Sequence, residues 1–151
     1  MVAYSFQPRF VPAIRSGLKR HTIRAERGGR SRHARPGELV QLYQGLRTRH
    51  ARLIAEPVCE EVWPVRLDLA GCVTIGIEIQ TDLDAFAVAD GFRDWADLCA
   101  FWRRQHPGVV VFSGVMIRWM PIVADHVTPE DVRRGGRGQM DLFPDPAAQA
   151  P

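Results

Sequence analysis

The segment Gly17-Leu18-Lys19-Arg20-His21-Thr22-Ile23-Arg24 decides the fold assignment, because it joins the end of a predicted helix to a predicted strand. Residues 6–17 carry a proline near their start, apolar residues on one side and Gly17 at their end. This pattern predicts a short helix that stops at the glycine. Residues 19–24 predict a strand or an extended turn. In a regular strand Lys19 and Thr22 would point to opposite faces, so a bend is needed to bring them together.

Lys19 is the only lysine in a chain that has nineteen arginines. Where composition favours arginine so strongly, a single lysine indicates a position that a guanidinium group cannot serve. A buried primary amine can lose its proton and act as a base or nucleophile, whereas arginine stays charged. Lys19 is therefore the first candidate catalytic residue.

The length and composition predict one globular domain followed by a tail. The 151 residues are 46% hydrophobic and 25% charged, which suits one domain with a real core. We expect this domain to span residues 1–122 and a flexible C-terminal tail to span residues 123–151. No stretch has the roughly 20 apolar residues of a membrane span, and no secretion signal is visible, so we expect a cytoplasmic protein without membrane contact. Three cysteines without a CxxC pair predict neither disulfides nor a metal site, and no cofactor is implied.

The positive charge is concentrated in the first third of the chain. Residues 1–52 carry twelve basic residues and two acidic ones, a balance of +10, whereas the rest of the chain carries eight basic and fifteen acidic residues. A positive field confined to one region favours an anionic partner, of which nucleic acid is the commonest. The alternative is an arginine-rich surface that only contacts solvent.

The remaining chain predicts an α+β fold. Strands are expected at residues 38–43, 51–56, 58–67, 72–79 and 109–120, and helices at residues 82–89 and 94–106. Residues 25–37 are basic and glycine-rich and predict a mobile loop. This order of elements indicates a small, mostly antiparallel β-barrel with flanking helices.

Several motifs in this order resemble the ASCH family, a relative of the PUA-like RNA-binding barrels. Gly17, Lys19, Thr22 and Arg24 complete its GxKxxTxR signature, and residues 36–40 look like its following Gly-Glu strand start. Residues 42–48 and 87–92 are similar to further segments of a bacterial and phage branch. The resemblance covers about residues 4–120 and implies a PUA-like fold.

The resemblance also implies a function. Some small ASCH proteins are amidohydrolases that remove the acetyl group of N4-acetylcytidine with Lys, Thr and Glu, which would correspond here to Lys19, Thr22 and Asp90. The partner would then be RNA or a modified nucleoside. Other members are thought to bind RNA, and ribonuclease activity has been reported in the family. A non-catalytic module for single-stranded RNA and a metal-independent ribonuclease are therefore the alternatives.

Asp90 departs from the glutamate of the hydrolases. Its side chain is one methylene shorter, so its carboxylate is expected to fall about 1 Å short of Lys19 unless the backbone compensates, which would slow catalysis. In the expected chemistry, Thr22 attacks the acyl group or positions water, Lys19 accepts the proton and Asp90 orients the amine. The alternative is an ordinary ion pair between Lys19 and Asp90, with Thr22 as a strand residue.

Further candidates surround this trio in the sequence. Arg24, as an oxyanion ligand, and Tyr43, Arg47 and Phe92 are the candidate substrate-binding residues. The candidate nucleic-acid contacts are Arg20, His21, Arg27, Arg30, Arg32, Arg35 and Arg49. The alternatives are core packing for the aromatic residues and a solvated surface for the arginines.

The tail carries one further pattern. Residues 139–143 resemble the Q-x-x-L-F peptide with which bacterial proteins dock into the replication sliding clamp, which makes Gln139, Leu142 and Phe143 candidate partner-binding residues. Exposed Leu and Phe side chains after a glycine-rich lead suit such docking. The alternative is that Leu142 and Phe143 fold back onto the domain.

Overall fold

The structure, a computed structural model, describes residues 1–122, so the predicted tail and its clamp-docking pattern lie outside the described residues. The elements, in chain order, are β1 (Val2–Phe6), the 3-10 helix η1 (Pro8–Phe10), α1 (Val11–Arg15), β2 (His21–Arg24), β3 (Val40–Gln44), β4 (Arg52–Ala55), β5 (Cys59–Asp68), β6 (Cys72–Ile75), β7 (Glu78–Ile79), α2 (Leu83–Ala89), α3 (Trp95–Gln105) and β8 (Val111–Trp119). These elements confirm the predicted α+β class.

The described strands form two sheets. One has the order β1-β3-β4, and the other has the order β2-β8-β5-β6-β7. Every pairing is antiparallel except that of β1 with β3. An isolated bridge between Leu39 and Val58 connects the two sheets, but no closed barrel forms among residues 1–122. The mostly antiparallel arrangement is confirmed, whereas barrel closure is not.

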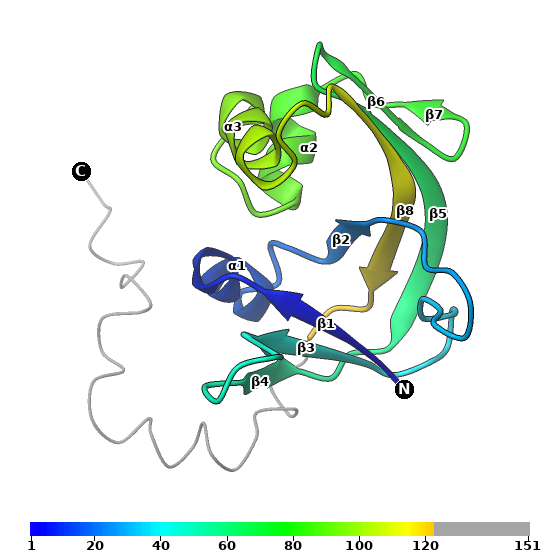
Figure 1. Cartoon of the computed structure of the whole chain (residues 1–151), viewed down its shortest axis with the longest axis vertical. Helices are drawn as coiled ribbons and strands as arrows, with labels where there is room; N and C mark the ends of the chain where they lie inside the picture. The colour runs from blue at the N-terminus through cyan, green and yellow to red at the C-terminus, as the bar shows by residue number, and fades with distance from the viewer. Residues whose placement is uncertain (123–151) are drawn as a thin grey trace, which may run out of the picture.

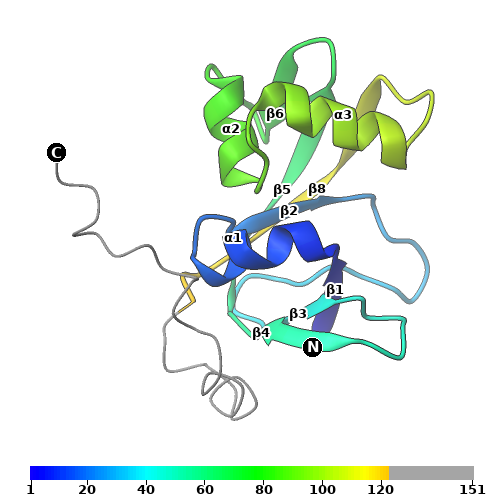
Figure 2. The ribbon, with the colours of Figure 1, turned by 90° about the vertical axis from the view of Figure 1, so that its left-hand side faces the viewer.

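The arrangement of the sheets leaves α1 and β2 in the middle of the molecule. Strands β5 and β8 run as a long arc, with α2 and α3 near one end of it and the β1-β3-β4 sheet near the other (Figure 1). Figure 2 shows α1 and β2 crossing between these two halves. The hydrophobic core runs through both halves, from Tyr4 and Leu42 to Ile117 and Trp119. The segment that joins α1 to β2, which includes Lys19, is thereby held at the centre of the fold.

Local sequence signals account for most of the elements. Asp82 and Asp94 cap α2 and α3, because their carboxylates accept the backbone N–H groups of Ala85 and Asp97. The strand expected at residues 72–79 is wrong: a turn at Gly76 divides it into β6 and β7. Gly76 has φ of 60° and lies against the Trp63 ring, so it suits a turn better than a continuous strand.

The basic segment 25–37 is anchored to the domain. His33 stacks on the Tyr4 ring, and the buried Ala34 donates its backbone N–H to the Tyr4 hydroxyl. Arg32 forms two hydrogen bonds with the Glu38 carboxylate. These contacts oppose the predicted mobility of the segment at its C-terminal half.

The described residues contain no helix that is long and apolar enough to cross a membrane. Cys59, Cys72 and Cys99 are free thiols, of which the first and last are buried. Within residues 1–122, no group of three or more His, Cys, Asp or Glu side chains is placed to hold a metal ion.

Candidate functional site

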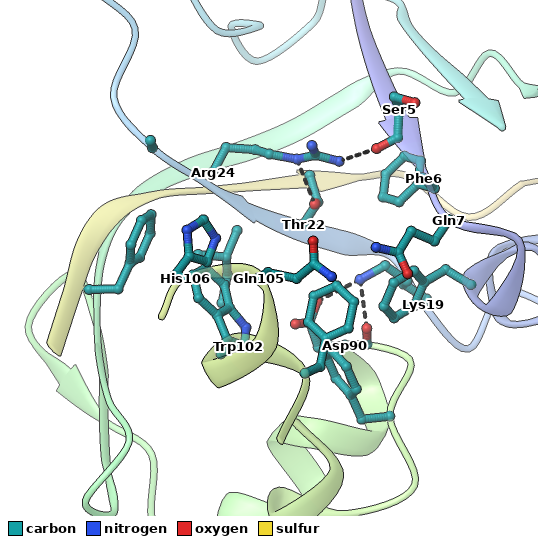
Figure 3. Close-up of a pocket in the computed structure, with 16 residues that line it drawn as sticks. Ser5, Phe6, Gln7, Lys19, Thr22, Arg24, Asp90, Trp102, Gln105 and His106 are labelled. Carbon is teal, nitrogen blue, oxygen red and sulfur yellow. Dashed lines mark hydrogen bonds and ion pairs between the residues drawn. The ribbon is translucent and has the colours of Figure 1, made fainter. Parts of the chain in front are cut away.

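A cavity of about 360 Å³ opens beside the central α1–β2 connection. Its polar side is formed by Lys19, Thr22, Arg24 and Asp90, as Figure 3 shows. Its apolar side is aromatic and is formed by Phe10, Phe92, Phe101, Trp102 and Phe112. The cavity therefore brings together segments that lie far apart in the sequence, around the lysine that composition singled out.

Lys19 and Asp90 form a buried ion pair at the wall of this cavity. The Lys19 amine donates to Asp90 Oδ1 at 2.6 Å and to the Asp90 backbone carbonyl at 2.6 Å. The two residues are only 3% and 4% exposed. The backbone holds both partners, because the Lys19 N–H donates to the Ala13 carbonyl of α1 and Asp90 caps the C-terminus of α2.

The backbone compensates for the shorter side chain of Asp90. The carboxylate reaches Lys19 because the backbone of residue 90 itself approaches the amine closely enough to accept a second hydrogen bond. Gly91 permits this approach, since it has φ of 92° and leaves room for the Lys19 stem and the Phe10 ring. Aspartate therefore reaches the Lys19 amine at this position without an additional methylene.

Replacing Gly91 with alanine tests this backbone arrangement. A β-carbon at residue 91 would lie 3.0 Å from Lys19 Cδ and 3.1 Å from Phe10 Cδ1, and φ would have to stay positive. We expect a loss of about 1–2 kcal/mol in the free energy of unfolding, measured by urea titration. Gly108→Ala is the matched control, because Gly108 also has positive φ but nothing lies within 4 Å of its added β-carbon. Equal losses in both variants would contradict the close packing at Gly91.

Thr22 faces the same cavity but does not contact Lys19 by a hydrogen bond. Strand β2 begins at His21, so Lys19 lies outside the regular strand, before its first residue. Arg24 donates from Nε to Thr22 Oγ1 at 3.1 Å and from Nη2 to the Ser5 carbonyl at 2.7 Å. Because Thr22 Oγ1 accepts from a cation, its own hydroxyl proton remains available for a base in the cavity.

Burial dominates the electrostatics of the site. Desolvation lowers the pKa of Lys19, while the charge and hydrogen bond of Asp90 oppose this shift, and the Arg24 charge lowers the pKa further. Desolvation also lowers the pKa of Arg24. The environment therefore favours release of the Lys19 proton despite the adjacent carboxylate.

Two of the four predicted substrate contacts line the cavity. Arg24 and Phe92 do so, whereas Tyr43 and Arg47 do not. Tyr43 lies on β3 opposite Ser5, and Arg47 lies exposed in the turn between β3 and β4. Any contact of these two residues with a ligand would occur outside the cavity.

The predicted nucleic-acid contacts have different surroundings. Arg20 pairs with Glu60 and with the Trp119 carbonyl, and the Arg27 guanidinium lies over the Tyr4 ring. Arg32 is held by Glu38, and His21 is buried. Five arginines of this set are exposed: Arg27, Arg30, Arg32, Arg35 and Arg49. These are thus the members of the set that are open to solvent.

Sequence reasoning missed several residues of the cavity. Gln7, Gln105 and His106 line it, and so does Trp102, which stacks on His106 with ring centroids 5.0 Å apart. The sequence marks Trp102 as an inward-facing residue, because it lies on the apolar side of α3. Gln7, Gln105 and His106 had none, because they lie at the ends of elements where exposed polar residues are usual.

Comparison with known proteins gives no assignment. No protein-family model matches the chain, and no curated protein or solved structure matches it significantly. The ASCH resemblance therefore rests on the motif residues, and membership of that family stays a prediction.

Proposed function

We propose that this protein is an ASCH-type amidohydrolase with a PUA-like fold, which binds a modified nucleobase and removes the acyl group from N4-acetylcytidine. The observation that carries the proposal is the buried Lys19–Asp90 pair beside Thr22 in an aromatic cavity. A lysine whose pKa is lowered by burial is suited to general-base chemistry at neutral pH. An ion pair with only a structural role would not require a neighbouring hydroxyl and an open cavity.

The chemistry follows from the positions of these groups. The Thr22 hydroxyl attacks the acyl carbonyl, or holds the water that attacks it, and neutral Lys19 takes the proton. The protonated amine then gives this proton to the departing N4 nitrogen, which releases cytidine. Where Thr22 carries the acyl group, a water deprotonated by the same amine releases it as acetate. Arg24, which already contacts Thr22 Oγ1, stabilises the oxyanion.

The rest of the cavity suits a flat polar ring. Phe92 and Trp102 offer aromatic faces on which a base can stack. The side chains of Gln7 and Gln105 carry both a donor and an acceptor, which match the mixed donor and acceptor edge of a pyrimidine. A volume of about 360 Å³ is within the usual range for a small-molecule site.

The direct test is incubation of the purified protein with N4-acetylcytidine, with release of cytidine and acetate followed by chromatography. We expect turnover by the native protein and a loss of at least about 10²-fold in Thr22→Val, which removes the hydroxyl but keeps the shape. Arg47→Ala is the matched control, because Arg47 is exposed and outside the cavity.

The same assay separates the alternative functions. Binding of the nucleoside without turnover would replace the proposal with a non-catalytic binding module. An RNA oligonucleotide with one acetylated cytidine distinguishes a polymer substrate from a free nucleoside, and cleavage of its backbone without metal would indicate a ribonuclease. Undiminished turnover by Thr22→Val would contradict the role of its hydroxyl.

A further inference from the structure

His21 is a buried titratable residue that the proposed chemistry does not use. It is 8% exposed, and its ring stacks on Phe86 of α2 with centroids 5.7 Å apart and planes inclined by 26°. Its Nε2 atom lies 3.3 Å from Asp90 Oδ1. This nitrogen nevertheless has no hydrogen-bond partner among the described residues, because the orientation of the contact is unfavourable.

Asp90 Oδ1 therefore has two nitrogen neighbours that compete for it. The Lys19 amine lies 2.6 Å from this oxygen, and His21 Nε2 lies 3.3 Å from it. The His21 ring lines a second cavity of about 420 Å³, whereas Lys19 lines the first cavity. The Asp90 carboxylate thus lies between the substrate cavity and a histidine on the far side of β2.

The unpartnered Nε2 atom of His21 favours movement of the Asp90 carboxylate toward His21. A buried polar group without a partner is unfavourable, so His21 gains a hydrogen bond whenever the carboxylate turns toward it. A neutral Lys19 amine has two N–H groups and one lone pair, so it can accept a proton from Thr22 or water while it still donates to Asp90. Because the neutral amine has no positive charge, it holds Oδ1 less strongly, and a hydrogen bond from His21 to the carboxylate offsets part of this loss.

We propose that His21 is a positioning residue that donates a hydrogen bond to Asp90 Oδ1 when Lys19 is neutral and its lone pair faces the substrate. The inference rests on the proposed function, in which Lys19 is the base. His21 acts through Asp90 and does not touch the substrate. Without His21, the Asp90 carboxylate would have no second hydrogen-bond donor beside a neutral Lys19, which would favour the protonated amine.

The charges around both residues agree with this role. Burial lowers the pKa of His21 to about 4, with Asp90 opposing the shift and Lys19 and Arg118 adding to it. The ring is therefore neutral near pH 7 and can offer one N–H, at Nε2, to the carboxylate. The charged neighbours of Lys19 are Asp90, which raises its pKa, and Arg24, which lowers it.

The lone lysine allows a direct test without substrate. Protein labelled with ¹³C at lysine Cε gives a single side-chain lysine signal, whose chemical shift reports the protonation of Lys19. We expect the titration midpoint of this signal to move to higher pH in His21→Phe, which keeps the ring stack but removes the donor. The fraction of neutral Lys19 at a given pH should fall by about tenfold. His21→Gln restores an N–H donor and should return the midpoint toward that of the native protein.

Trp119→Phe is the matched control, because Trp119 Nε1 is the other buried side-chain nitrogen without a partner among the described residues. It should leave the midpoint unchanged. If His21→Phe does not fold, His21→Leu provides the same comparison with a smaller side chain. An unchanged or lower midpoint in the donor-less variant would overturn the inference, as would a His21→Gln midpoint equal to that of His21→Phe. Because the titration needs no turnover, its failure is distinct from a failure to hydrolyse N4-acetylcytidine.

Discussion

Lys19→Met should abolish most of the hydrolysis and also destabilise the fold. The variant keeps the length of the side chain but removes the base, so we expect kcat/KM for N4-acetylcytidine to fall by about 10²–10⁴-fold. It also leaves the Asp90 carboxylate, which is 4% exposed, without its cation. Removal of one partner from a buried ion pair costs about 3–5 kcal/mol in the free energy of unfolding, which urea titration would measure.

Two further variants separate the charge of Lys19 from its basicity. Lys19→Arg keeps a cation beside Asp90 but cannot supply a neutral base, so it should lose activity and recover part of the stability. Lys19→Met combined with Asp90→Asn removes both charges, so it should be more stable than Lys19→Met alone and equally inactive. Appreciable hydrolysis by Lys19→Arg would contradict the role of Lys19 as the base.

The motif of residues 17–24 carried much of the site because its residues are neighbours in the chain. A helix that ends at Arg15, followed by a turn and a short strand, places Lys19, Thr22 and Arg24 within one turn and one strand of each other. Local rules are sufficient for such an arrangement. The need for a departure from regular strand geometry between Lys19 and Thr22 also followed from the sequence alone, and in the structure Lys19 lies before the first residue of β2.

The pairing of Lys19 with Asp90 needed the family resemblance, because 71 residues separate the two in the chain. No periodic pattern reports a contact between residues so far apart. Whether the backbone would compensate for the shorter side chain of Asp90 could not be predicted for a related reason. Side-chain length was visible in the sequence, whereas the position of the α2 C-terminus relative to Lys19 is set by packing among Phe10, Phe92 and Phe101.

Strand β1 was the main feature of the fold that sequence reasoning did not supply. Strand β1 is short and pairs in parallel with β3, a strand that begins more than thirty residues later. A strand is recognised from its own pattern with difficulty when it has only five residues. Barrel closure depends on which strand edges meet, and alternation of apolar residues does not encode this.

The stability of the protein should fall as the pH falls from about 6.5 toward 4, and His21 should be a main cause. Burial lowers the pKa of His21 from 6.5 to about 4. Above this window the ring is neutral in both the folded and unfolded states. Within it the unfolded chain binds a proton that the folded protein does not, so the free energy of unfolding decreases as the pH falls. Between pH 6.5 and about 4, this effect should lower the free energy of unfolding by about 3 kcal/mol in total.

The matched variant for this pH effect is His21→Gln, which has no titratable ring. His33 acts in the same direction as His21, since its pKa is also lowered, so the comparison must be between variant and native protein. Urea titrations from pH 7 down to about 5 avoid the carboxylate of Glu38, whose ordinary pKa is 4.5. The native protein should lose stability relative to His21→Gln at up to about 1.4 kcal/mol per pH unit. Parallel stability curves for the two proteins would show that His21 is not held neutral by burial.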